Sequence, residues 1–212
     1  MKIENEQNQI VKRDLKREAM KAKLISAAKA RIESSGLSSL RARDVTEDAG
    51  CALGALYNVF EDLDGLILEV NAQTLAALDA DVEAATTGAG DAGQRLRYLG
   101  QRYLEFARAH EKLWRALFEL RLANGRPLPD WIMANQVKLL SHIAKPLAQL
   151  QPELNEQELM IRTRTMFAAV HGIVSLSLDN RFVSLATETL GEEIDRFIGL
   201  LLQGLKSEAT AH

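Results

Sequence analysis

Residues 36–67 read GLSSLRARDVTEDAGCALGALYNVFEDLDGLI, and this stretch decides the fold. It predicts two short helices, at about 41–49 and 53–60, with a sharp turn between them. Gly50 permits that turn, because glycine tolerates backbone conformations that other residues avoid. The order of helix, tight turn and helix is typical of a helix-turn-helix.

The apolar residues of this stretch are spaced so that both helices face one core. Val45 and Ala49 form the buried side of the first helix, and Leu56 and Phe60 anchor the second. Cys51 is a small apolar residue that suits the turn. The side of the second helix that remains exposed is therefore expected to read DNA, through base edges and phosphates. Its residues are Ala52, Leu53, Gly54, Ala55, Tyr57 and Asn58.

The charge of the chain is divided sharply around this stretch. The whole chain has a net charge of −3, which excludes a protein that binds nucleic acid with its entire surface. Residues 10–43, however, contain ten basic and three acidic residues, whereas residues 44–70 contain seven acidic residues and none that is basic. We therefore expect the basic segment to clamp DNA phosphates and to hold the acidic segment in place. The clamp residues are Lys12, Arg13, Lys16, Arg17, Arg41 and Arg43.

The rest of the chain predicts further helices, because Ala, Leu, Glu, Arg and Gln dominate and alternating strand patterns are missing. The fold class expected is all-α, with an N-terminal domain of residues 12–70, a second domain of residues 71–212 and the boundary within the fourth helix. Residues 1–10 are expected to be disordered, and Pro146 to kink or shorten its helix. The other helices are expected at 12–35, from 63 onward, and at 93–110, 111–123, 129–150, 153–180 and 187–206.

Residues 36–67 resemble the DNA-binding module of the TetR family of bacterial repressors. Ala49, Gly50, Gly54, Leu56, Tyr57, Phe60 and Leu66 match the family pattern without a gap. Trp114, the VHG at 170–172 and the LPDW at 128–131 resemble the subgroup whose C-terminal region is called the WHG domain. The resemblance implies a three-helix DNA-binding domain followed by a helical domain that binds an effector and dimerises.

The chain also departs from the family pattern, mostly by losing hydroxyl and ammonium donors. In the family several of these positions cap helices or contact phosphate, and replacing an N-cap serine by alanine typically costs about 1 kcal/mol of helix stability. The departures are Arg41, Thr46, Ala52, Ala55 and Leu63. They leave open a protein of this fold with a weakened DNA module that acts through protein partners.

The second domain is rich in aromatic residues and methionine, which are more often ordinary core than a ligand site. The resemblance favours a cavity for a small, largely apolar effector. His171 lies in an apolar run and must form a hydrogen bond, either to a neighbouring helix or to the effector. The candidate effector-binding residues are Tyr103, Phe106, Trp114, Phe118, Trp131, Met133, Phe167 and His171.

The last two helices combine small and large apolar residues, which predicts packing against their copies in a second chain. A homodimer would present two recognition helices to a palindromic operator in double-stranded DNA, with the half-sites about 34–36 Å apart. An effector that moves the C-terminal helices would change that spacing and release the DNA. The candidate interface residues are Ala168, Gly172, Ser175, Ile194, Phe197 and Leu201.

Other functional classes find little support. No catalytic or metal-binding motif occurs and the four histidines stand apart, so no enzyme, metal or cofactor is expected. A small-molecule-binding or catalytic helical protein centred on His171 and Trp114 stays a rival interpretation. With a single cysteine and neither a signal peptide nor a membrane-spanning run, we expect a cytoplasmic protein that makes no membrane contact.

Overall fold

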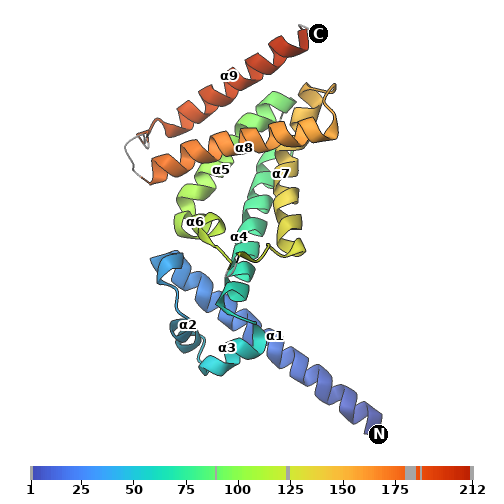
Figure 1. Ribbon diagram of the computed structural model, residues 1–212, viewed down its shortest axis with the longest axis vertical. Helices are drawn as coiled ribbons and strands as arrows, with labels where there is room; N and C mark the ends of the chain where they lie inside the picture. The colour runs from blue at the N-terminus through green and yellow to red at the C-terminus, as the bar shows by residue number, and fades with distance from the viewer. Residues whose placement is uncertain (1, 89, 123–124, 180–184, 187, 211–212) are drawn as a thin grey trace. The chain divides into compact units, whose positions relative to one another are not determined.

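The computed structural model describes residues 2–88, 90–122, 125–179, 185–186 and 188–210. The regular secondary structure in these residues is helical throughout (Figure 1), and the predicted all-α class is confirmed. The chain forms two compact units. The first comprises Met1–Thr74 and Glu111–Leu128, and the second comprises Leu75–His110 and Pro129–His212.

The first unit contains the helix-turn-helix. Its first helix packs against the two short helices that follow and against the sixth helix. That first helix starts at Lys2, so the expectation of disorder in residues 1–10 is wrong for the part that the structure describes; its Glu, Gln and Lys residues are good helix formers. The elements are α1 (Lys2–Ser35), a 3-10 turn η1 (Leu37–Ser39), α2 (Ala42–Asp48), α3 (Leu53–Val59), the first half of α4 (Leu63–Thr86) and α6 (Glu111–Glu119).

Two glycines set the path of the chain between these helices. Gly36, directly after α1, has φ 81°, and Gly50, between α2 and α3, has φ 67°. Both φ values are positive, a backbone conformation that glycine adopts readily and that other residues rarely adopt. The predicted ends of the first helix and of α2 are thus explained by the residue type at each turn.

The core of the first unit is built from the apolar face of α1 and the helices around it. Leu24, Ala28 and Ile32 of α1 are fully buried, as are Val45 of α2 and Leu56 of α3. The first unit includes residues 1–74, against a predicted domain of residues 12–70, and it also includes α6. Its Leu113 and Ala116 join the same core, which explains why residues 111–128 group with the helix-turn-helix.

The second unit is a helical bundle. It contains the rest of α4 together with α5 (Ala92–Ala109), α7 (Asp130–Leu150), α8 (Glu156–Leu178) and α9 (Leu190–Thr210). In this unit α5 packs against α7, α8 and α9, and α7 packs against α8. The helix α7 continues past Pro146 to Leu150, so the proline does not shorten it. Within the described residues, no helix is both long and apolar enough to cross a membrane.

Side-chain caps fix where two of these helices begin. The Asp91 carboxylate accepts a hydrogen bond from the Gln94 backbone N–H at the start of α5. At the start of α8, Asn155 and Glu158 form a reciprocal capping box. Each arrangement satisfies backbone donors that would otherwise lack partners.

Candidate functional site

The helix α3 presents the surface that the sequence predicts to read DNA. Leu56 is fully buried and anchors the helix, whereas Tyr57 is 52% exposed and Asn58 is also exposed. No atom lies within 4 Å of the position that a Cβ on Gly54 would occupy, so a partner could approach the backbone there. Among the other predicted contact residues of this helix, Ala52 is exposed, and Leu53 and Ala55 are partly buried.

The loss of a helix cap, expected from the sequence, is visible at both short helices. Ala52 occupies the N-cap of α3 and Arg41 that of α2, and neither side chain caps its helix. Arg41 instead donates through Nη1 to the carbonyls of Ser38 and Leu40, each at 2.9 Å. No side chain therefore caps the first backbone N–H groups of α3, although the N–H of Ala55 donates to the carbonyl of Ala52 at 2.9 Å.

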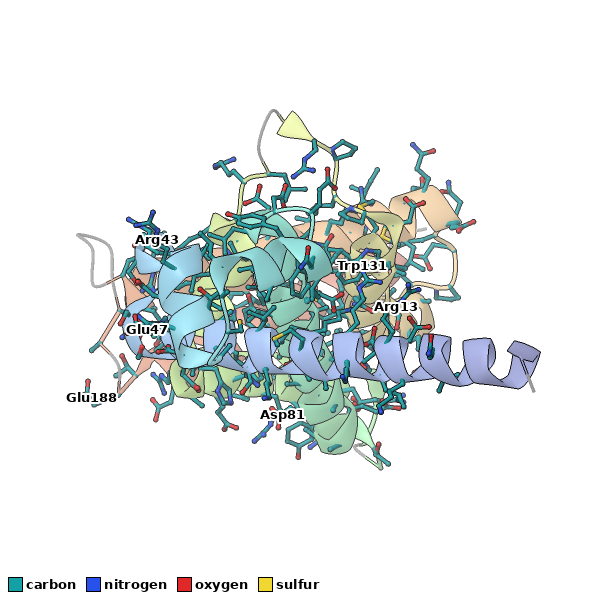
Figure 2. All side chains as sticks on the ribbon, turned by 90° about the horizontal axis from the view of Figure 1, so that it is seen from below. Arg13, Arg43, Glu47, Asp81, Trp131 and Glu188 are labelled. Carbon is teal, nitrogen blue, oxygen red and sulfur yellow. The ribbon has the colours of Figure 1, made fainter. Side chains whose placement is uncertain are left out.

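The four predicted clamp residues of α1 are all exposed. Figure 2 shows Arg13 on the part of α1 that extends beyond the two short helices, while Arg43 and Glu47 lie on α2. Arg17 differs from the others, because its Nη2 donates to the carbonyl of Val59 at 3.4 Å. Val59 is the last residue of α3, so Arg17 supports the C-terminal end of α3 with a favourable charge.

The acidic half of the module is largely neutralised within the first unit. Arg31 of α1 forms two hydrogen bonds with Asp48, at 2.5 and 2.8 Å, and lies 3.5 Å from an oxygen of Asp44. Lys21 Nζ lies 2.6 Å from a Glu69 oxygen. Arg31 and Lys21 both belong to the basic segment 10–43, so these two cations are paired within the protein.

Arg126 neutralises the remaining acidic cluster, and the sequence analysis did not identify it. Its guanidinium donates to Asp62 at 2.5 Å and lies 3.8 Å from oxygens of both Glu61 and Asp64. The pKa of Asp62 is lowered by the backbone N–H of Gly65 and then by Arg126. No sequence signal pointed to Arg126, because it follows Asp62 by 64 residues along the chain.

The second unit contains an apolar cavity of about 60 Å³. Tyr103 and Phe167, both predicted to bind an effector, line it. Most of its wall comes from apolar residues that were not among the candidate effector-binding residues, since their helical spacing is that of any buried core. These residues are Val82, Leu96, Leu99, Gly100, Leu139, Leu140, Ile143, Met166, Val170 and Ile198, and His142 completes the lining.

Polar groups border this cavity at two places. Tyr103 Oη and His171 Nδ1 share a hydrogen bond of 2.7 Å, and burial lowers the pKa of His171. His142 Nε2 donates to Asp79 at 2.8 Å, and Lys138 donates to the other Asp79 oxygen at 2.6 Å. Burial raises the pKa of Asp79, but the hydrogen bonds from Lys138 and His142 bring the net value below its usual range.

Six predicted effector residues do not line this cavity, and one of them, His171, instead forms a hydrogen bond with the lining residue Tyr103. Trp114 is buried, and together with Phe118 it belongs to the first unit, where the two rings make an edge contact at 5.5 Å. Phe106 is buried against His110, with the ring centroids 4.8 Å apart. Trp131 and Met133 of α7 are 44% and 49% exposed, because they lie on the outer face of that helix. Burial and helix face, which composition does not specify, separate these residues from Tyr103 and Phe167.

The predicted dimer residues divide into accessible and inaccessible sets. On α8, Ala168 is exposed, and Gly172 and Ser175 are partly buried; on α9, Phe197 and Leu201 are partly buried. Ile194 is fully buried in its own chain, where it lies 3.1 Å from the position of a Cβ on Gly100. The prediction that Ile194 lies at an interface is therefore wrong, because its side chain completes the packing of α9 on α5.

Comparisons with known proteins agree with this architecture. The family described as tetracyclin repressor-like, C-terminal domain, matches residues 96–201, which is half of the chain. This range contains Trp114 and residues 170–172, which the sequence analysis had singled out. No curated protein matches the chain in sequence.

Solved structures share the fold at low sequence identity. A protein of unknown function from Rhodococcus sp. RHA1 has a TM-score of 0.71 at 20% identity, over 88% of this chain and 95% of that one. A transcriptional regulator from Rhodococcus sp. Rha1 has a TM-score of 0.64 at 24% identity, over 87% and 96%. A TetR-family transcriptional regulator from Bordetella parapertussis 12822 has a TM-score of 0.60 at 16% identity, over 84% and 93%.

The helix-turn-helix, the helical second unit and the match to the C-terminal domain together identify the family. The chain belongs to the TetR family of transcriptional regulators.

Proposed function

We propose that this regulator is a homodimeric repressor that an apolar effector releases from a palindromic operator. The single observation that carries the proposal is the exposed face of α3. Tyr57 and Asn58 project from it, and Gly54 leaves open space beside them. Asparagine can pair with adenine, and a tyrosine hydroxyl can bind phosphate, so this uncharged face suits a DNA groove.

Affinity for the DNA backbone would come from α1 and from the start of α2. Lys12, Arg13, Lys16 and Arg43 are exposed, and two acidic residues near α3, Asp48 and Asp62, are paired with Arg31 and Arg126. Phosphate contacts of this kind hold a protein on DNA regardless of sequence and weaken steeply with salt. The arrangement supports a division of labour in which α1 supplies affinity and α3 supplies specificity.

The effector would enter the apolar cavity of the second unit. A dry cavity of about 150 Å³ holds a benzene molecule, whereas this one is about 60 Å³, so it would have to widen. Met166 in the wall is flexible enough to make room. A neutral, mostly apolar molecule fits this lining, with Tyr103 and His142 as its hydrogen-bonding partners. Widening the cavity would shift the helices around it and so transmit the signal.

Dimerisation would use the outer faces of α8 and α9. Large apolar side chains are exposed there, with Ile161 at 57%, Leu176 at 43% and Leu200 at 62%. Ala168 and Gly172 on α8 are small enough to let a second copy approach closely. A second chain that covers these faces would give the regulator two recognition helices.

The experiment is fluorescence anisotropy with two duplexes, one from upstream of the protein's own gene and one of scrambled sequence. The binding constants are measured across a salt series. We expect tighter binding to the upstream duplex and a steep loss of affinity with salt. Weak and equal binding to both duplexes would favour a regulator of this fold that acts through protein partners.

A further inference from the structure

An acidic turn directly follows the recognition helix. Glu61, Asp62 and Asp64 lie between the end of α3 at Val59 and the first turn of α4. In water at physiological salt, charges still act over a Debye length of about 8 Å, so three carboxylates beside a DNA-reading helix would repel phosphates. If this helix docks on DNA, the charge of the three carboxylates must be neutralised and their side chains must be held in fixed positions.

The guanidinium of Arg126 interacts with all three carboxylates. Arg126, in the segment that follows α6, donates to Asp62 and lies 3.8 Å from an oxygen of Glu61 and 3.8 Å from one of Asp64. Arginine suits this role because its planar fork can serve several acceptors at once. The contact therefore organises the whole turn rather than a single pair.

The same contact fixes the start of α4. The Asp62 oxygen that Arg126 leaves free accepts a hydrogen bond from the Gly65 backbone N–H at 2.8 Å. Asp62 is thus an N-cap, held from the other side by Arg126. The Arg126 side chain is 40% exposed, so core packing does not account for its position.

We propose that Arg126 is a positioning residue for DNA binding, which holds the acidic turn after α3 in a neutralised, fixed conformation. This inference rests on the proposed DNA-binding function. Without Arg126 the three carboxylates would be released to turn toward the phosphates, and the N-cap of α4 would lose its support. Arg126 would act through this turn and would not contact DNA itself.

The test compares Arg126→Gln with Arg121→Gln in the anisotropy assay. Arg121 is exposed in the same segment and forms no ion pair among the described residues, so its variant controls for the loss of one positive charge. We expect Arg126→Gln to weaken binding to both duplexes about two- to fivefold more than the control does, given the usual strength of exposed charge pairs. The excess should shrink as salt is added. Arg126→Lys should restore part of the affinity.

A neutralised background separates positioning from direct contact. In a Glu61→Gln, Asp62→Asn, Asp64→Asn variant the turn has no charge to control, and the asparagine that replaces Asp62 could still cap α4. In that variant, Arg126→Gln should weaken DNA binding no more than Arg121→Gln does. An equal excess in both backgrounds would overturn the inference in favour of a direct phosphate contact.

The neutralised variant has no carboxylate at this turn for Arg126 to hold, so Arg126→Gln can be compared with Arg121→Gln in that background even if Arg126→Gln alone is unstable. An excess over the control there would overturn the inference. Wild-type protein that binds no duplex at low salt would overturn the proposed function, and this inference with it. Wild-type binding that Arg126→Gln weakens no more than the control would overturn this inference alone.

Discussion

Gly50 and Gly54 lie four residues apart and differ only in backbone conformation. At both positions the space for a Cβ is open, with no atom within 4 Å. Gly50, however, has φ 67°, whereas Gly54 lies inside α3. Substitution by alanine therefore tests the backbone and not the packing.

We predict opposite effects on stability for the two alanine variants. Gly50→Ala should lower the free energy of unfolding by about 1 kcal/mol, because a left-handed backbone is costly for alanine. Gly54→Ala should raise it by a few tenths to about 1 kcal/mol, because alanine favours the helix. Urea unfolding followed by circular dichroism measures both. Equal effects in the two variants would show that the turn does not need a glycine.

His171 should make the stability of the protein depend on pH. Burial lowers the pKa of His171 in the folded chain, so the unfolded chain takes up the proton at a higher pH. The free energy of unfolding should therefore be highest above about pH 6.5, the ordinary pKa of histidine, and fall as the pH drops from there through the folded pKa. One proton sets an upper limit of about 1.4 kcal/mol per pH unit, and partial exposure of the ring reduces this.

The measurement is urea unfolding at pH 7.5 and pH 5.5 for the wild type and for His171→Gln. Glutamine cannot titrate, so the variant should lose less stability between the two pH values than the wild type does. The other histidines are present in both proteins and cancel in the comparison. An identical loss in both proteins would assign the pH dependence to other groups.

At the scale of elements, α1 combines two tasks along its length. Its C-terminal half packs Leu24, Ala28 and Ile32 into the core of the first unit, while its N-terminal half carries Lys12 and Lys16 in solvent. These two lysines form no ion pair among the described residues. They therefore remain available to a DNA backbone.

We predict that Lys12→Gln with Lys16→Gln weakens binding to the upstream and the scrambled duplex by the same factor. Each phosphate contact that is lost should also reduce the magnitude of the slope of log K against log salt by about 0.9, so the loss of both contacts should reduce it by about 1.8. The salt series of the anisotropy assay measures both quantities. Lys145→Gln, an exposed cation of α7 in the second unit, provides the charge control. A weakening confined to the upstream duplex would instead mean that these lysines read sequence.

The elements themselves were largely predictable, since helix breaks follow local chemistry. Gly36, Gly50 and the cap at Asn155 end or start helices near the expected residues. The start of α1 was not predictable, because a charged segment with good helix formers can be helical or disordered. The extent of α7 agrees with the predicted 129–150, but the shortening expected at Pro146 does not occur, because tertiary packing outweighs the cost of one missing hydrogen bond; Pro146 and its neighbour Leu147 are both buried.

At the scale of the whole molecule, the proposed effector response requires coupling between the cavity and DNA. Thermodynamic linkage makes such coupling reciprocal. A molecule that lowers DNA affinity by a given factor must bind the DNA complex less tightly by the same factor. The probes are benzene, indole and 1-octanol, which are small and mostly apolar like the cavity wall.

We predict that at least one of these probes lowers operator affinity and that the two coupling factors agree. Anisotropy gives the DNA affinity with and without the probe, and calorimetry gives the probe affinity with and without DNA. Val82→Leu adds one methylene to the cavity wall. It should weaken binding of the probe without changing DNA binding when no probe is present. A probe affinity that is indifferent to DNA would contradict the coupled mechanism.

The sequence by itself determined the helix-turn-helix, because turn glycines and helical periodicity act over a few residues. It also located the exposed face of α3 and the cations of α1. Only the tertiary structure decided which carboxylates Arg31 and Arg126 neutralise, that α6 joins the first unit, and that Tyr103 and Phe167 line a cavity from which Trp131 and Met133 are absent. These features depend on contacts between residues far apart in the chain and on which helix face is buried. Composition and spacing do not specify either one.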